Sequence, residues 1–243
     1  MTVGGGAGRI PGAAGAAAVR DRLVLGLDVG DLAAATATAR RLEPWFATVK
    51  VGHELYAEAG PAAFDQLHEL GFRVFCDLKL HDIPTTVERA ARAHARHGVA
   101  FLNAHTAGGV AMMRAFVAGA RAGAGDAGLE PPVTLGVTVL TSEPTASAFD
   151  ERAGIAAAAG CDGVVCSTAE AGRAAARGLR SMVPGIRLPE GERHDQARVA
   201  TPAEAIIAGS TWLVIGRAVH GADDPEAAAA AVSAQVAAAL GAA

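Results

Sequence analysis

The chain has 243 residues, of which 51% are hydrophobic and 4% aromatic, with a formal net charge of −4. This length is typical of one (β/α)8 barrel, and the hydrophobic content is enough for a sizeable core of Val, Leu, Ile and Ala. The slightly acidic balance argues against binding to nucleic acid or to anionic membranes. No apolar run reaches the roughly 20 residues that would span a bilayer.

The first 20 residues, "MTVGGGAGRIPGAAGAAAVR", are rich in Gly and Ala and have no strongly apolar stretch. We therefore expect residues 1–20 to be a flexible extension, not a signal peptide, and residues 21–243 to form a single domain. Cys76, Cys161 and Cys166 lie in strand-like runs, which predicts buried free thiols in a protein of the reducing cytoplasm.

Eight apolar, strand-like runs follow one another along the chain, at residues 22–30, 46–52, 72–79, 99–106, 132–140, 161–167, 181–187 and 211–216. Ala-rich stretches with helical character lie between them, at residues 31–43, 84–98, 109–123 and 202–209, and a last one covers 224–240. Alternating strands and helices predict parallel strands with crossover helices. Eight such units favour a closed α/β barrel, the TIM barrel, over an open sheet.

Polar residues gather where these strands end. They are Asp28, Lys50, Asp77, Lys79, His105, Thr141, Ser142, Gly216 and Arg217. In a barrel the carboxyl ends of all strands share one face, where active sites are built. A role as helix cap or surface charge is the alternative; it suits Asp31 or Ser167, but not lysines at the ends of two apolar strands.

The segment "DLKLHDIP", residues 77–84, carries the densest charge. Because strand side chains alternate between faces, Asp77 and Lys79 are expected to point together into the barrel mouth. With Lys50 from the neighbouring strand they would form an array that keeps Asp77 ionised and Lys79 charged as a proton donor. A purely structural Asp–Lys pair is the alternative. Asp82 lies beyond the strand end and is free to reach a neighbour.

Other polar residues have more ordinary readings. His94 and His97 are expected to be solvated on a polar helix, and His81 to make a structural hydrogen bond. "VIGRAV", residues 214–219, predicts a phosphate site in which backbone N–H groups near Gly216 and the Arg217 guanidinium bind the anion, unless it is a plain turn. Residues 187–198 are expected to form a lid over phosphate or an ordinary surface loop.

The segment "DLKLHDIPTTV" at 77–87 closely resembles the active-site segment of the orotidine 5′-phosphate decarboxylase family. The same resemblance holds, in the family's order, for "LDVG" (27–30), "KVG" (50–52), "VTVLTS" (137–142), "PGIR" (184–187), "DQAR" (195–198) and "VIGRAV". It implies a (β/α)8 barrel that forms homodimers with active sites at the interface. It also implies decarboxylation of orotidine 5′-phosphate to UMP and CO2, the last step of de novo pyrimidine nucleotide synthesis, without metal or organic cofactor.

The resemblance also implies roles for individual residues. Lys79 resembles the proton donor to C6 of the pyrimidine, and Asp77 the carboxylate that faces the substrate carboxylate. Asp82 resembles the aspartate that enters the partner's active site. Lys50 resembles the catalytic lysine that bridges the aspartates and the ribose, and Asp28 resembles a ligand of a ribose hydroxyl. The other expected substrate contacts are Ile83, Thr86, Thr141, Ser142, Pro184, Arg187, Gln196, Gly216 and Arg217.

Two rival functions remain open from the sequence. A sugar-phosphate decarboxylase or aldolase of the same superfamily would share the Asp-x-Lys-x-x-Asp pattern but use Mg²⁺. A catalytically dead barrel that binds a nucleotide or phosphate is the other; the presence of Lys50, Asp77, Lys79 and Asp82 argues against it.

Overall fold

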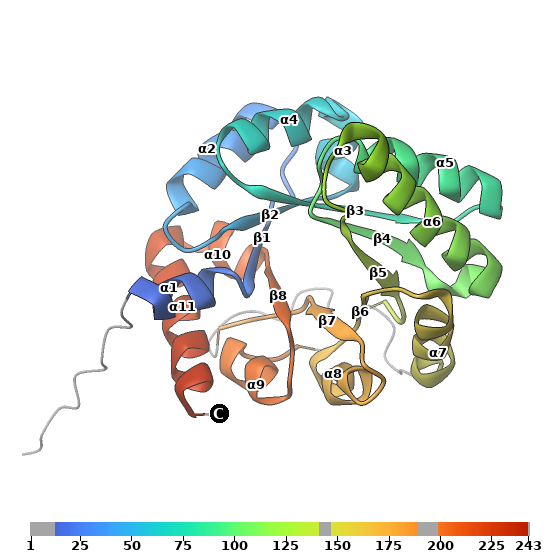
Figure 1. Ribbon diagram of the computed structural model, residues 1–243. Helices are drawn as coiled ribbons and strands as arrows, with labels where there is room; N and C mark the ends of the chain where they lie inside the picture. Colours follow the sequence, from blue (N-terminus) through green and yellow to red (C-terminus); the bar gives the residue numbers. More distant parts are fainter. Residues whose placement is uncertain (1–12, 141–146, 189–198, 243) are drawn as a thin grey trace, which may run out of the picture.

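The eight predicted strands form a closed parallel barrel, in the order of the chain, with helices around its outside (Figure 1). The structure, a computed structural model, describes residues 13–140, 147–188 and 199–242. The strands are β1 Leu23–Gly26, β2 Thr48–Val51, β3 Arg73–Leu80, β4 Phe101–His105, β5 Val133–Val137, β6 Gly163–Val165, β7 Arg180–Val183 and β8 Trp212–Ile215. The predicted (β/α)8 architecture is confirmed.

The outer layer is helical. Its helices are α1 Ala13–Arg20, α2 Leu32–Leu42, α3 His53–Ala59, α4 Ala62–Glu69, α5 Pro84–Ala95, α6 Gly109–Ala127, α7 Phe149–Ala159, α8 Thr168–Ala175, α9 Pro202–Ile207, α10 Arg217–His220 and α11 Pro225–Ala242, with a 3₁₀ turn at Thr106–Gly108. Asp31 caps α2 by accepting from the Ala34 N–H, and Ser167 forms a capping box with Glu170 on α8. These two residues are therefore helix caps.

The amino-terminal extension is only partly what the sequence predicted. Ala13–Arg20 forms α1, which lies beside α11 (Figure 1). Val19 is buried in the core, and the Arg20 guanidinium donates to Glu43 Oε1 at 2.7 Å. The prediction that residues 1–20 are flexible is therefore wrong for α1, because the buried Val19 and the Arg20–Glu43 contact attach this helix to the barrel. Residues 1–12 lie outside the described part of the chain.

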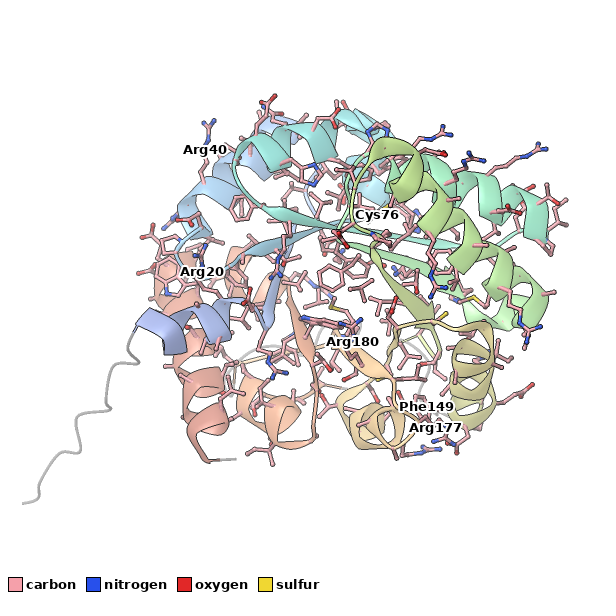
Figure 2. All side chains as sticks on the ribbon, in the orientation of Figure 1. Arg20, Arg40, Cys76, Phe149, Arg177 and Arg180 are labelled. Atoms are coloured by element: carbon pink, nitrogen blue, oxygen red, sulfur yellow. The ribbon has the colours of Figure 1, made fainter. Side chains whose placement is uncertain are left out.

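The barrel interior is closed at its amino-terminal end by inward-facing apolar side chains. This cluster contains Val24, Phe75, Phe101, Leu135, Met182, Trp212 and Val214. The Phe101 ring meets the Trp212 ring edge-on at 4.9 Å, and the Arg180 guanidinium lies 5.0 Å from the centre of the Trp212 ring. Figure 2 shows Arg180 in the middle of the ring of strands. Since this layer fills the barrel, the carboxyl ends of the strands are left to hold a ligand cavity.

The pairing of β3 with β4 is irregular at the charged segment. Phe75 pairs with Phe101 and Cys76 with Leu102, but the next pair is Leu80 with Ala104. Three residues of β3 thus lie opposite one residue of β4, which is a β-bulge. Lys79 takes a φ of 49°, in the left-handed region, and such a residue costs about 1–3 kcal/mol. The expected uniform alternation across Asp77 and Lys79 is therefore wrong, although the two side chains do meet.

The structure confirms the prediction for the three cysteines and contradicts the prediction for His94. All three cysteines are buried and free, as predicted, and burial raises the pKa of the Cys161 thiol to about 12. His94 is buried, not solvated: its ring lies edge-on to Tyr56 at 5.4 Å, and burial lowers its pKa. It follows Val87 and Ala91 on the buried face of α5, so its helical spacing places it in the core. His97 remains partly exposed.

Candidate active site

Four charged side chains from β1, β2 and β3 form an alternating array at the barrel mouth. Lys50 Nζ lies 2.7 Å from Asp28 Oδ1 and 3.4 Å from Asp77 Oδ2. Lys79 Nζ donates to Asp77 Oδ1 at 2.8 Å. Lys50 and Asp77 are buried, Lys79 is half-buried and Asp28 is exposed. The array predicted from the strand ends is therefore present, and it runs from solvent into the barrel.

Barrel register and one glycine bring these groups together. Gly26 of β1 pairs with Lys50, and Lys50 pairs with Phe75 of β3. A Cβ at Gly52 would lie 3.1 Å from Lys50 Nζ and 3.2 Å from Asp28 Oδ1. The glycine of the "KVG" motif thus leaves the space in which the lysine and the aspartate meet.

Burial and the neighbouring charges act in opposite directions on the ionisable groups of the array. Burial alone would raise the pKa of Asp77, but the charges of Lys50 and Lys79 and the hydrogen bonds from Lys79 and Asn103 outweigh it and lower that pKa. Burial alone would lower the pKa of Lys50, but Asp77 and Asp28 outweigh it and raise that pKa. Both groups are therefore charged at neutral pH.

The lysine content of the chain is concentrated at this site. Lys50 and Lys79 are the only two lysines among the 243 residues, while arginine supplies the other 19 basic side chains. Arginine stays protonated and is a poor proton donor, whereas a lysine ammonium can transfer a proton. Every lysine in the chain is thus a member of the charged array.

A cavity of about 210 Å³ opens beside the array. Eight of the predicted site residues line it: Asp28, Lys50, Asp77, Lys79, Pro184, Arg187, Gly216 and Arg217. Arg187 is buried, and its Nη1 donates to the Ile186 carbonyl at 2.9 Å. The two arginines follow β7 and β8, the usual phosphate-binding position in such barrels, while the Lys–Asp array comes from β1 to β3. The cavity therefore has one region lined by the Lys–Asp array and another lined by Arg187 and Arg217.

Three predicted residues lie outside the cavity lining. Asp82, Ile83 and Thr86 are exposed, and Ile83 is 66% exposed. Asp82 Oδ1 accepts a hydrogen bond from the Ile83 N–H at 2.6 Å. Within one subunit, Asp82, Ile83 and Thr86 therefore do not line the cavity that Lys79 lines.

Three further predicted contacts fall outside the described residues. Thr141 and Ser142 belong to residues 141–146, and Gln196 belongs to residues 189–198, which also contain most of the expected lid.

The sequence reasoning missed Asn103. This residue of β4 is fully buried, and its side chain contacts both Asp77 and the backbone of Lys79. The signal was available, because Asn103 stands between Phe101 and His105 at an inward-facing position of a strand whose other residues before His105 are apolar. The His105 ring lies 5.7 Å from the His81 ring. The structural hydrogen bond expected of His81 stays a prediction.

Metal and membrane features are absent from the described part of the chain. Residues 13–140, 147–188 and 199–242 contain no group of three or more His, Cys, Asp or Glu side chains that could hold a metal ion. No helix within these ranges is long and apolar enough to cross a membrane.

The fold and site define the class: a (β/α)8-barrel enzyme with a Lys–Asp array and, across the same cavity, two arginines. A family model described as "Orotidine 5'-phosphate decarboxylase / HUMPS family" matches residues 21–232. This chain belongs to that family.

Individual relatives agree with the family. The orotidine 5′-phosphate decarboxylase of Halorhodospira halophila is 43% identical over 233 residues, covering 90% of this chain and 97% of the relative. The orotidine 5′-phosphate decarboxylase of Moorella thermoacetica is 42% identical over 238 residues, covering 89% of this chain and 92% of the relative. The crystal structure of the Lactobacillus acidophilus orotidine 5′-phosphate decarboxylase is similar with a TM-score of 0.71 at 31% identity, covering 89% of this chain and 99% of that one.

Proposed function

We propose that this chain decarboxylates orotidine 5′-phosphate to UMP and CO2, the last step of de novo pyrimidine nucleotide synthesis, with Lys79 as the proton donor. The observation that carries the proposal is the Asp28–Lys50–Asp77–Lys79 array at the edge of a cavity that Arg187 and Arg217 also line. The 43% identical relative named for this activity supports the same substrate.

The reaction needs no external electron acceptor. The bond between C6 and the carboxylate carbon breaks, CO2 leaves, and the electron pair stays on C6. The Lys79 ammonium stabilises this developing negative charge and then transfers one proton to C6, which yields UMP. Lys79 regains a proton from solvent. We propose that the reaction uses neither a metal nor an organic cofactor.

Asp77 is proposed to face the substrate carboxylate and to raise the energy of the bound substrate. Two like charges about 4 Å apart at an effective dielectric near 20 repel by roughly 4 kcal/mol. Enzymes lower barriers by about 8–23 kcal/mol, so this repulsion cannot be the main contribution. Stabilisation by Lys79 and binding energy from the remote phosphate supply the remainder.

The remaining cavity residues are assigned to binding. We place the phosphate at Arg187, Gly216 and Arg217, where two guanidinium groups can make bidentate contacts. Lys50 and Asp28 hold the ribose hydroxyls. Pro184, Thr141, Ser142 and Gln196 contact the base or close over the substrate.

The active form is proposed to be a homodimer. Asp82, Ile83 and Thr86 form an exposed segment directly after the charged strand, and Ile83 is a large apolar side chain exposed by 66%. A single exposed apolar side chain is ordinary on a protein surface, so the support for a subunit contact here is the resemblance of residues 77–87 to the active-site segment of the family. In the dimer Asp82 would enter the partner's active site, and Ile83 and Thr86 would contact the substrate there. The three free cysteines support a place in the reducing cytoplasm.

The test is the loss of orotidine 5′-phosphate absorbance on addition of the purified protein. Activity is expected, and it should persist after dialysis against EDTA. Loss of activity with EDTA, restored by Mg²⁺, would favour the metal-dependent sugar-phosphate chemistry. A folded protein that binds UMP without turning over the substrate would point to a dead barrel.

A further inference from the structure

The β3 bulge leaves one residue of β4, Asn103, opposite Asp77, Leu78 and Lys79. Bulged residues lose their regular ladder partners, so their backbone groups need other ones. Asn103 is fully buried, and its side chain points from the inward face of β4 at this bulge. Asn103 is therefore placed to form hydrogen bonds with the bulged residues Asp77 and Lys79.

Both ends of the Asn103 amide are used. Oδ1 accepts from the Lys79 backbone N–H at 2.8 Å, and Nδ2 donates to Asp77 Oδ1 at 2.7 Å. The same Asp77 oxygen accepts from Lys79 Nζ at 2.8 Å. The three residues therefore close a ring of hydrogen bonds in which Asn103 holds the backbone of the lysine and the carboxylate that the lysine contacts.

The first of these bonds acts on an unfavourable backbone conformation. Lys79 is the one non-glycine residue in the described part of the chain with a positive φ. Residues in such conformations persist only where their surroundings hold them, and they concentrate at functional sites. The Oδ1 of Asn103 replaces the strand carbonyl that the bulge removes, and so fixes the direction in which the Lys79 side chain leaves the backbone.

We propose that Asn103 is a positioning residue, which holds Lys79 in its left-handed conformation and Asp77 in contact with the Lys79 ammonium, so that the pair is oriented before substrate binds. The proposal rests on the proposed function for the role of Lys79. Asn103 does not line the cavity and is not assigned any contact with substrate.

The first test does not depend on activity. Because the chain has two lysines, protein labelled with ¹⁵N only in lysine gives two backbone amide signals, from Lys50 and Lys79. Asn103→Leu, which keeps the branching at Cγ but has no polar side-chain atoms, should shift the Lys79 signal strongly and the Lys50 signal little. An unmoved Lys79 signal would overturn the proposal. The control Thr106→Val removes a buried hydrogen bond to the Val137 carbonyl near the same strand end and should move neither signal strongly.

The second test uses Asn103→Asp, which keeps the shape and one acceptor and so avoids the folding risk of the leucine variant. It replaces the Nδ2 donor by a carboxylate oxygen that repels Asp77 at about pH 8, and kcat should fall about 100-fold with KM changed only a few-fold. The introduced carboxyl has a raised pKa beside Asp77. Once protonated it can donate to Asp77 again, so the deficit in kcat should shrink towards about pH 5.5.

Three outcomes would each refute the positioning role. They are an unchanged kcat in Asn103→Asp, a change in KM alone, and a loss of kcat that is the same at all pH values. Failure of this inference is distinct from failure of the proposed function. If the wild-type protein lacks decarboxylase activity the proposed function fails, while the two-signal spectrum still decides whether Asn103 holds Lys79.

Discussion

Lys79 Nζ lies 2.8 Å from Asp77 Oδ1, although the two residues are separated by only one position on a strand. The bulge and the left-handed backbone of Lys79 bring the ammonium onto the carboxylate. The proposed proton donor and its anionic neighbour are thus paired in the ligand-free protein, as expected of a preorganised site.

Removal of Lys79 tests its proposed chemical role. Lys79→Ala should reduce turnover by at least about 10⁴-fold, because one group supplies both charge stabilisation and the proton. UMP should still bind, since Arg187 and Arg217 remain, and calorimetry measures this directly. Arg41→Ala, which removes an exposed positive charge on α2, is the control and should keep full turnover. Near-normal turnover of Lys79→Ala would exclude it as the proton donor.

Mixing inactive variants tests whether Asp82 acts across the proposed dimer. Asp82→Ala and Lys79→Ala proteins should each be inactive, and subunit exchange between them should restore some activity. In the mixed dimer one site would combine an intact Lys79 with an intact Asp82 from the partner subunit. The pair Asp77→Ala and Lys79→Ala should recover nothing, because both residues belong to the same side of one site. Demonstrated exchange without recovery would place Asp82 outside the partner's site.

Removal of Lys50 should reduce stability as well as activity. Lys50→Met leaves Asp77 buried with one cationic partner fewer, and loss of one member of a buried pair costs about 3–5 kcal/mol. We expect the lower end, about 3 kcal/mol in urea unfolding, because Lys79 still contacts Asp77. The double variant Lys50→Met/Asp77→Asn should regain part of this loss.

The matched control for Lys50 is an exposed ion pair. Asp126→Asn breaks the contacts of Asp126 with Arg92 and Arg96 on the surface and should leave the unfolding free energy nearly unchanged. Equal effects of the surface and the buried changes would contradict a special role for burial in the array.

Acid should weaken the contribution of Asp77. Its pKa in the folded protein is lowered, so its ionised form stabilises the fold above the unfolded pKa of about 3.9, and this stability is lost as the pH falls through the folded pKa. The difference in unfolding free energy between wild type and Asp77→Asn should therefore be constant from about pH 7 to about pH 5 and shrink below about pH 4. A difference that grows in acid would mean that the pKa is raised.

The barrel and most of the cavity were predictable because they depend on periodic features. Strand ends converge on one face of a barrel, so Lys50, Asp77 and Arg217 could be placed from their positions in eight similar units. Arg187 was expected only from the family resemblance. The burial of His94 was also readable from its helical spacing after Val87 and Ala91, but its polar neighbours in the sequence suggested solvent.

The parts that could not be predicted depend on local departures from periodicity. The bulge places Lys79 at a φ of 49°, and the pairing of Asn103 with it depends on a register shift between two strands. The left-handed φ of Lys79 and the register shift between β3 and β4 cannot be predicted from the alternation of apolar and polar residues. The α1 helix is held by the buried Val19 and by the contact of Arg20 with Glu43. Composition alone does not distinguish this Ala-rich stretch from a flexible tail.

The confinement of lysine to the charged array has a practical consequence for handling the protein. Dyes, crosslinkers and aldehyde resins that attack primary amines find on this chain only Lys50, Lys79 and the terminal amino group. The side chain of Lys79 is 28% accessible and that of Lys50 10%. Conjugation through side-chain amines would therefore modify the Lys–Asp array itself, and a nucleotide bound as proposed would shield both lysines. Enzymes that acylate lysine on other proteins would likewise find no target on this surface apart from the mouth of the barrel.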